Sequence, residues 1–334
     1  MSHLELQWLV PLILLALVFD FMNGFHDSAN SIATVVATRV LSPQFAVIWA
    51  ACFNLLGPLL FEQHVAHTVG SGIIDIGIVT PRLVASALIG AIVWNIFTWY
   101  YGIPSSSSHA LIGGLVGGGV YEGGLNAMVW KGILKTVAFI FLSPIIGMVL
   151  GSLTFLAIAW IFRRKTPYRV DSIFRKMQLV SSSLYSIGHG TNDAQKTMGI
   201  IFMLLVTGGV VAKGDPIPNW VILVCSGAIA LGTAFGGWRI VKTMGIHITR
   251  LNPCGGFSAE VAGAVTLFGA STFGIPVSTT HTITGAIVGV GSANRYSAVR
   301  WRLARQIVWA WILTIPAAAA VAMLTELAVD LFRR

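Results

Sequence analysis

The sequence predicts an all-α polytopic membrane protein built from two inverted-topology repeats of about five membrane passes each. Three observations carry this prediction: an apolar composition, apolar runs of membrane-spanning length, and the return of the same polar motifs in both halves of the chain. Of the 334 residues, 55% are hydrophobic and only 10% are charged, with a mean hydropathy of +0.81. A typical soluble domain carries about 25% charged residues.

Apolar stretches close to the roughly 20 residues that a helix needs to cross a bilayer recur along the chain. Examples are 6–22, 83–101 and 307–332. The alternating pattern of a membrane barrel is absent, so we expect the spans to be helices. The first stretch lacks the basic start and the cleavage pattern of a signal peptide, and we therefore expect a retained first helix in a multi-pass protein of the inner (plasma) membrane.

The formal net charge of +9 does not predict a nucleic-acid partner. The basic residues gather in short loops between apolar segments, at 163–176, 239–250 and 295–305. The excess of Lys and Arg in cytoplasmic loops explains this distribution, and the lipid bilayer is the partner that it indicates. The three cysteines are too few for a disulfide framework or a zinc site.

Two pairs of motifs occur in the same order before and after the central basic loop. The segment NGFHDSAN begins at Asn23 and is matched by HGTNDAQK from His189, while GIPSSSSHALIGG from Gly102 is matched by GIPVSTTHTITGA from Gly274. Matches this dense indicate a duplication. We predict a first repeat over residues 1–165 and a second over 170–334, which together form one functional unit.

The pattern within each half predicts how the repeats are oriented. Each half has a first segment broken at the Asp motif, a second segment, a pair joined at the Gly-Ile-Pro turn, and a long last segment. Five passes are an odd number, so the second half is inverted relative to the first. We expect broken or re-entrant helices at both motifs, ten to twelve helices in all, and both termini outside with the central basic loop inside.

The hydroxyl clusters after Gly-Ile-Pro predict an anion site. Glycine and proline before a run of hydroxyls indicate a broken backbone and a new helix, whose N-terminus offers unpaired N–H groups and a partial positive charge. The alternative is that these side chains bond to backbone carbonyls or let helices pack. Duplication favours the anion site, whose expected donors are Ser106, Ser107, Ser108, Ser278, Thr279 and Thr280.

Asp27 and Asp193 lie in apolar segments, where a carboxylate is costly and faces a cavity, a cation or a proton path. Asn30 and Asn192 offer neutral oxygen ligands nearby, of the kind that a hard cation requires. The alternative is a pair of structural carboxylates fixed by neighbouring helices. The presence of one such carboxylate in each half favours a functional role over a structural one.

The histidines are weaker signals. His109 and His281 follow the hydroxyl clusters and can either hold them or carry a proton, while a satisfied core histidine is as plausible. His26 stands directly beside Asp27.

Four segments, GFHDSANSIAT, GIPSSSSHALIG, GHGTNDAQK and GIPVSTTHTITGAIVG, resemble the signature segments of the inorganic phosphate transporter (PiT) family. The resemblance spans essentially the whole chain and both repeats. It implies a symporter rather than an enzyme, importing inorganic phosphate on a cation gradient and assembling as a homodimer. It also implies a central site built from the Asp–Asn motifs and the Ser/Thr clusters, with no cofactor besides a coupling proton or sodium ion.

One departure bears on the coupling ion. Where the first half has Asn30, the second has Lys196, whereas many sodium-coupled members resemble the asparagine form in both halves. The sequence is therefore more similar to the bacterial proton-coupled, low-affinity branch, whose substrate can be a neutral metal–phosphate complex. We expect Asp193 to pair with Lys196, and Asp27, beside His26, to carry the coupling proton. Were sodium bound instead, Asp27 and Asp193 would be its ligands.

Two other functions remain as alternatives. A permease for sulfate or a related oxyanion would use a similar hydroxyl cage, but phosphate carries protons that nearby carboxylates can accept, and two acids therefore favour phosphate. An intramembrane serine hydrolase needs one asymmetric nucleophile–base pair. Here both halves carry the same set, and Ser108 and His109, adjacent on a helix, point apart. A passive anchor would not need intramembrane acids.

Overall fold

The computed structural model describes residues 3–333, which fold into helices without a β-strand. The first six α-helices are α1 (His3–Ala37), α2 (Pro43–Leu60), α3 (His64–Gly72), α4 (Pro81–Tyr100), α5 (Ser107–Gly123) and α6 (Trp130–Ile161). The second six are α7 (Pro167–Thr207), α8 (Asn219–Phe235), α9 (Trp238–Lys242), α10 (Pro253–Thr272), α11 (Thr279–Asn294) and α12 (Trp301–Arg333). Short turns lie at Ile76–Ile78 (η1), Leu125–Ala127 (η2), Thr243–His247 (η3) and Tyr296–Ala298 (η4).

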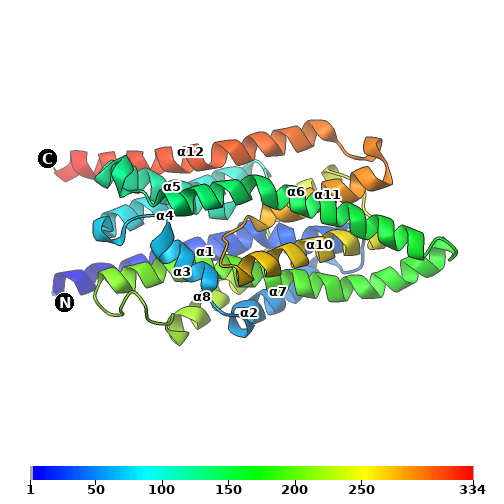
Figure 1. The fold of residues 1–334 in the computed structure, drawn as a ribbon, viewed down its shortest axis with the longest axis horizontal. Helices are drawn as coiled ribbons and strands as arrows, with labels where there is room; N and C mark the ends of the chain where they lie inside the picture. The colour runs from blue at the N-terminus through cyan, green and yellow to red at the C-terminus, as the bar shows by residue number, and fades with distance from the viewer. Residues whose placement is uncertain (1–2, 334) are drawn as a thin grey trace.

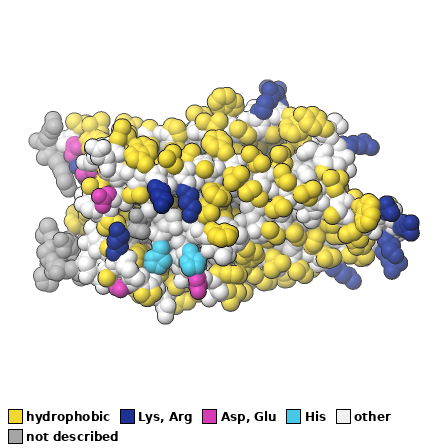
Figure 2. All heavy atoms as spheres, viewed as in Figure 1, with side chains coloured by type: hydrophobic (Ala, Val, Ile, Leu, Met, Phe, Trp, Pro, Cys, Tyr) yellow, Lys and Arg dark blue, Asp and Glu magenta, His cyan; other side chains and the backbone are white. Residues whose placement is uncertain are grey.

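The helices have the length and composition of a multi-pass membrane protein, which confirms the predicted all-α polytopic class. Within the described residues, five are long and apolar enough to cross a bilayer: α1, α2, α4, α6 and α12. Helix α8 and the segment Trp238–His247, bent by 62° at the break between them, together pass the same test. Figure 2 shows apolar side chains spread over the middle of the bundle, where lipid would contact it.

The Asp motifs do not break their helices, and this part of the prediction was wrong. Helix α1 runs without interruption past Asp27, and α7 past Asp193. The glycines of these motifs serve close packing instead. A Cβ atom on Gly24 would lie 2.2 Å from the carbonyl oxygen of Ile229 on α8, and one on Gly190 would lie 2.2 Å from that of Asn54 on α2.

The Gly-Ile-Pro motifs do interrupt the chain, as predicted. Gly102 follows the end of α4 with φ of 65°, and Gly274 follows the end of α10 with φ of 60°. Glycine adopts this left-handed conformation without a steric penalty. Extended residues then lead into α5 and α11, so each motif reverses the chain and starts a new, buried helix.

Helices of the first half pack against helices of the second. Helix α5 packs on α12 while α11 packs on α6, and α2 packs on α7 while α8 packs on α1. The Gly-Ile-Pro turns follow the same rule: the hydroxyl of Thr243 donates to the Gly102 carbonyl at 2.8 Å, and that of Thr68 donates to the Gly274 carbonyl at 2.8 Å. The described chain is therefore one interlocked bundle (Figure 1).

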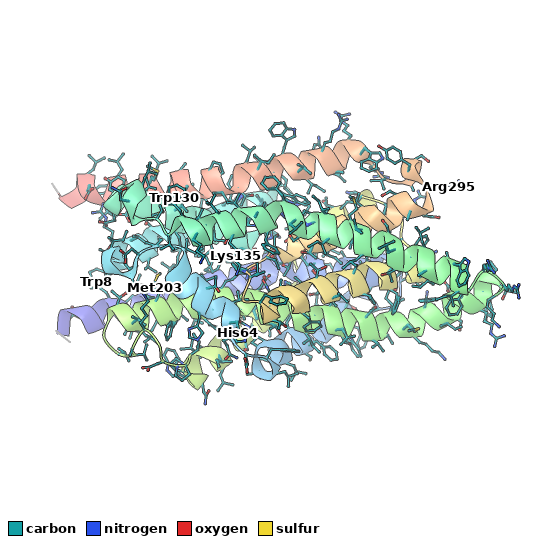
Figure 3. The ribbon with its side chains drawn as sticks, viewed as in Figure 1. Trp8, His64, Trp130, Lys135, Met203 and Arg295 are labelled. Atoms are coloured by element: carbon teal, nitrogen blue, oxygen red, sulfur yellow. The ribbon has the colours of Figure 1, made fainter. Side chains whose placement is uncertain are left out.

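Both described ends of the chain lie at one end of this bundle, and the α6–α7 turn lies at the other (Figure 1). Figure 3 places Trp8 near the first end and Arg295 at the second. On the face in Figure 2, Lys and Arg gather towards the α6–α7 end. We call the end of the bundle with the two chain ends the terminus end, and the end with the α6–α7 turn the basic end.

Candidate functional site

The N-termini of α5 and α11 meet inside the bundle. Ser106 caps α5 by accepting a hydrogen bond from the His109 backbone N–H at 3.3 Å, and Ser278 caps α11 through that of His281 at 3.1 Å. The His109 and His281 rings lie 4.5 Å apart, centroid to centroid. Two helix N-termini, each with a partial positive charge, therefore face one another in the protein interior.

Aromatic packing holds this junction in place. Trp311 of α12 stacks on the His281 ring at 3.8 Å and donates from its indole N–H to the carbonyl of Pro104 at 3.0 Å. One side chain of the last helix thus contacts the first Gly-Ile-Pro turn and the first turn of α11. The Nδ1 atom of His109 and the Nε2 atom of His281 have no hydrogen-bond partner, so each keeps a polar atom available at the junction.

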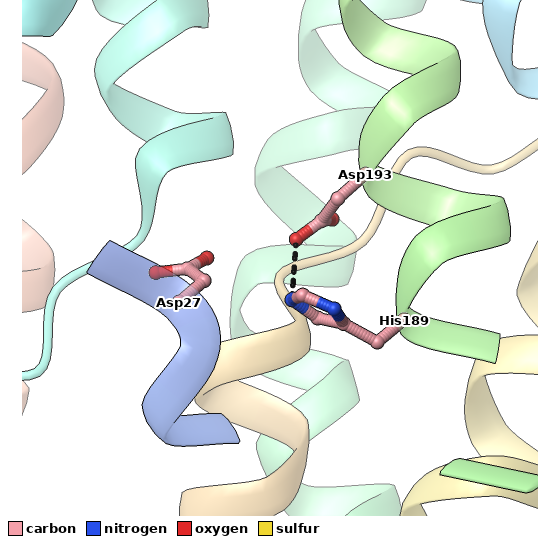
Figure 4. Close-up of side chains that lie close together, drawn as sticks. All are labelled: Asp27, His189 and Asp193. Carbon is pink, nitrogen blue, oxygen red and sulfur yellow. Dashed lines mark ion pairs between the residues drawn. The ribbon is translucent and has the colours of Figure 1, made fainter. Parts of the chain in front are cut away.

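The two predicted carboxylates come together at the same place. Figure 4 shows Asp27 of α1 facing Asp193 and His189 of α7. One ligand atom from each of these three residues lies within 4.8 Å of the other two, and all three side chains are buried. Two acids this close repel one another unless a cation, a proton or a hydrogen-bond donor compensates them.

Lys196 compensates Asp193. Its ammonium lies 2.5 Å from Oδ1 of Asp193, which confirms the expected pair. The same ammonium donates to the Ser108 hydroxyl at 2.5 Å and to the Val277 carbonyl at 2.9 Å. Lys196 is only 2% exposed, so its charge is satisfied entirely within the protein. It links the carboxylate to the starts of both α5 and α11.

His26 compensates Asp27. The His26 Nδ1 atom lies 2.7 Å from Oδ1 of Asp27, and its Nε2 atom lies 3.0 Å from the hydroxyl of Thr98 on α4. That hydroxyl also donates to backbone carbonyls of α4, among them that of Trp94 at 3.0 Å. The hydroxyl can accept from Nε2 or donate to it, and with either tautomer a proton lies between Nδ1 and the Asp27 carboxylate.

Two threonines connect the acids to Asn30. The Asn30 amide donates to the hydroxyls of Thr279 at 3.2 Å and Thr280 at 2.9 Å. Thr279 donates onward to Asp193 at 2.9 Å, and Thr280 to Asp27 at 3.4 Å. Asn30 and the first turn of α11 thus form one network with both carboxylates.

The remaining predicted residues divide into two groups. The hydroxyls of Ser106 and Ser278 are used as caps, whereas that of Ser107 is buried without a partner and can donate to a ligand. The Asn192 amide donates to Ser271 at 3.2 Å, away from the α11 hydroxyls, and its Oδ1 atom has no partner. Asn192 is therefore not the structural equivalent of Asn30.

Sequence reasoning missed three contributors. His189 lies 3.2 Å from Oδ2 of Asp193, one turn earlier on the same helix, and the His-x-x-x-Asp spacing could have indicated this contact. Thr98 carries no sequence signal. Glu260 of α10 is fully buried, and a carboxylate within an apolar segment was a visible sign of function.

Glu260 forms a second buried polar cluster, towards the basic end. It accepts hydrogen bonds from Thr34 at 2.6 Å, from Gln178 at 2.9 Å and from Ser181. These donors come from α1 and α7, the two helices that carry the central acids. The cluster extends the polar interior of the bundle beyond the α5–α11 junction.

The geometry does not build a serine hydrolase. The two histidines that contact acids contact no serine through their other nitrogens: His26 meets Thr98, and His189 Nδ1 lies 3.1 Å from the Asn54 side-chain oxygen. The described interior of this polytopic bundle holds facing helix N-termini and buried, paired charges. These features define a membrane transport protein. Facing helix N-termini suit an anion, and buried carboxylates suit a cation or a proton.

Comparison with known proteins gives the particular family. The signature of the Phosphate transporter family matches residues 23–322, and the chain belongs to this family. Its relatives include probable low-affinity inorganic phosphate transporters of Rhizobium meliloti, 62% identical over 99% of both chains, and of Bacillus subtilis, 43% identical over 93% of both. A solved structure entitled "The sodium-dependent phosphate transporter" is similar with a TM-score of 0.88 and 27% identity, covering 97% of this chain and 99% of that one.

Proposed function

We propose that the protein is a symporter that imports inorganic phosphate, binding it where the N-termini of α5 and α11 meet. The observation that carries this proposal is the 4.5 Å contact between the His109 and His281 rings, which brings two capped helix N-termini to one point. The unpartnered hydroxyl of Ser107 is a donor at this point. Neutral donors at helix N-termini suit a tetrahedral oxyanion.

Charge balance supports phosphate as the anion. Lys196 neutralises Asp193, and the His26–Asp27 pair holds one proton between its two members, so the helix N-termini are left to attract the substrate. A protonated phosphate can also donate its O–H to a carboxylate nearby, whereas sulfate carries no proton at neutral pH. The acids therefore favour phosphate over sulfate.

The contacts of Lys196 support the proton as coupling ion. Its ammonium binds a carboxylate, a hydroxyl and a carbonyl oxygen, which is the ligand set that a sodium ion would use. We infer that this ammonium permanently fills a cation position. The exchangeable positive charge is then the proton shared by His26 and Asp27.

The buried amide oxygens of Asn30 and Asn192 lack hydrogen-bond partners. Such oxygens are ligands for a divalent metal, and we infer that phosphate can enter as a neutral metal–phosphate complex held partly by them. Binding a neutral complex would spare the site the charge of a free anion.

We infer that residues 1–165 and 170–334 are inverted repeats that together form one transport unit. The exchanged packing of α5 on α12 and α11 on α6 supports this inference. The basic end is then cytoplasmic and both termini outside, in the inner membrane. The homodimer remains a prediction from the family resemblance.

Reconstitution tests the proposal. The purified full-length chain in proteoliposomes should accumulate labelled phosphate under an inside-alkaline proton gradient, and not under a sodium gradient alone. Protein-free liposomes are the blank. Unlabelled phosphate should compete and sulfate should not, and added Mg²⁺ should raise uptake if the complex is transported. Absence of accumulation under either gradient would contradict symport, and equal competition by sulfate would favour the oxyanion alternative.

A further inference from the structure

Asp20 is a buried acid that the central site does not use. It lies on α1 with 0% exposure, and neither of its carboxylate oxygens has a hydrogen-bond partner. A charged carboxylate left without a partner inside a membrane protein is strongly unfavourable. Asp20 therefore requires either a bound cation or a proton.

The surroundings of Asp20 come from α7 and α8. The side chains of Thr197 and Cys225 lie beside it, and Asp193 and Lys196 lie within one turn of Thr197 on α7. The Thr197 hydroxyl also lacks a hydrogen-bond partner, and Cys225 is fully buried. The Lys196 ammonium on the same stretch of α7 is already engaged with Asp193.

This environment suits a proton better than a metal ion. Sodium and divalent metals of the hard class take several oxygen ligands. The side chains of other helices beside Asp20 include one hydroxyl and one thiol, and a thiol is a poor ligand for these hard ions. A protonated, neutral carboxyl needs no further ligand and removes the cost of a buried charge.

Asp20 also lies at a different level of the bundle from the central acids. Asp20, Asp27 and Thr34 are spaced by seven residues on α1, so they lie on one face of the helix. Neighbouring members are about 10 Å apart along the axis. Thr34 bonds to Glu260 on the basic side, and α1 begins at the terminus end. Asp20 therefore lies between the terminus end and the central acids.

We propose that Asp20 is a second protonation site, which takes up the coupling proton on the terminus side and passes it to the His26–Asp27 pair. The proposal rests on the proposed function as a proton-coupled symporter. It assigns Asp20 a role in coupling, separate from phosphate binding.

The transfer conserves charge and atoms. The carboxyl O–H bond of Asp20 breaks and leaves a carboxylate. A proton binds between His26 Nδ1 and the Asp27 carboxylate, after that position has released its own proton towards the basic end. Because about 10 Å separates the two acids, water that enters when the site opens must relay the proton. Proton uptake from the terminus side then restores the Asp20 carboxyl.

Two measurements on the full-length chain test this role in wild type, Asp20→Asn and Asp20→Glu. The first compares phosphate counterflow without a gradient with accumulation driven by a pH gradient. We expect Asp20→Asn to retain counterflow but to accumulate roughly tenfold less phosphate or worse, because a proton-transfer group is gone. Asp20→Glu should restore accumulation. Accumulation by Asp20→Asn at the wild-type level would overturn the proposal.

The second measurement is infrared spectroscopy of the protonated carboxyl C=O band. Other buried acids, such as Glu260, remain in every variant, so the Asp20 band is identified from the difference between the wild-type and Asp20→Asn spectra. This difference band should be retained in Asp27→Asn. Absence of any difference band between wild type and Asp20→Asn contradicts the assignment. This result does not depend on transport. A wild type that shows the band but moves no phosphate would refute the proposed function and leave the protonation of Asp20 standing.

Discussion

The Lys196 ammonium lies 2.5 Å from the Asp193 carboxylate, one helical turn away, and both side chains are buried. The same ammonium binds the Ser108 hydroxyl and the Val277 carbonyl. One residue of α7 therefore holds the starts of α5 and α11 together. We therefore expect both ligand binding at this junction and the stability of the bundle to depend on Lys196.

Removing this ammonium should destabilise the protein. Lys196→Met leaves Asp193 buried without its counter-charge, and we expect unfolding to become easier by about 3–5 kcal/mol. Thermal unfolding in detergent measures the change. The double variant Asp193→Asn with Lys196→Met should recover much of the loss, because no uncompensated charge remains. Additive effects of the two substitutions would show that the pair is not coupled.

Replacing Lys196 by asparagine tests the cation position instead. Lys196→Asn vacates the oxygen ligands that the ammonium occupies and recreates the arrangement around Asn30 in the first half. We expect phosphate uptake to become sensitive to sodium, which wild-type uptake should not be. Lys196→Arg, which keeps the charge, is the control. Sodium-independent uptake by Lys196→Asn would argue against a vacated cation site.

Asp27→Asn should separate binding from coupling. The amide cannot accept the proton that His26 shares with the carboxylate at 2.7 Å, but it preserves the size of the side chain. We expect phosphate binding and counterflow to continue while accumulation driven by a proton gradient is lost. Persistent proton-driven uptake would remove Asp27 from the coupling role.

Two neighbouring serines make a matched pair for the anion site. The Ser107 hydroxyl is buried and free, so Ser107→Ala should weaken phosphate binding by about 1–3 kcal/mol with little loss of stability. The Ser106 hydroxyl caps α5, so Ser106→Ala should cost about 1 kcal/mol of stability. Phosphate titration and thermal unfolding of both variants distinguish the roles. Unchanged affinity in Ser107→Ala would mean that this hydroxyl only packs.

Cysteine labelling tests the orientation. Single cysteines at Tyr168, near the basic end, and at Lys213, in the connection after α7, should react with an impermeant thiol reagent from opposite sides of the membrane. The three native cysteines are first replaced by serine or alanine. We expect labelling of Lys213→Cys from outside and of Tyr168→Cys only from inside. The reverse pattern would invert the proposed topology.

Local chemistry explains which features the sequence could predict. The breaks at Gly102 and Gly274 and the capping serines depend on neighbouring residues, and the Asp193–Lys196 pair lies within one helical turn. The structure agrees with the sequence on all three. The family resemblance implied a central site that contains both Asp motifs, and the structure brings Asp27 and Asp193 together.

The errors and omissions depend on partners distant in sequence. Gly24 and Gly190 suggested broken helices, whereas each accommodates a backbone carbonyl of another helix. The contacts of Thr98 with His26 and of Glu260 with Thr34 join residues whose proximity only the folded bundle creates. No local pattern specifies which helix arrives at which face.

The exchanged packing of the helices has a consequence for biogenesis. When the ribosome has completed α6, the helices α11 and α12, against which α6 and α5 pack, do not yet exist. Synthesis must continue through the whole second half before these faces are covered. Until then the glycine surfaces of α5, such as Gly113 against Ile315, face lipid or the insertion machinery. The newly synthesised first half is therefore an incompletely packed intermediate in the membrane. Its packing is completed only when α12, the last helix synthesised, is inserted.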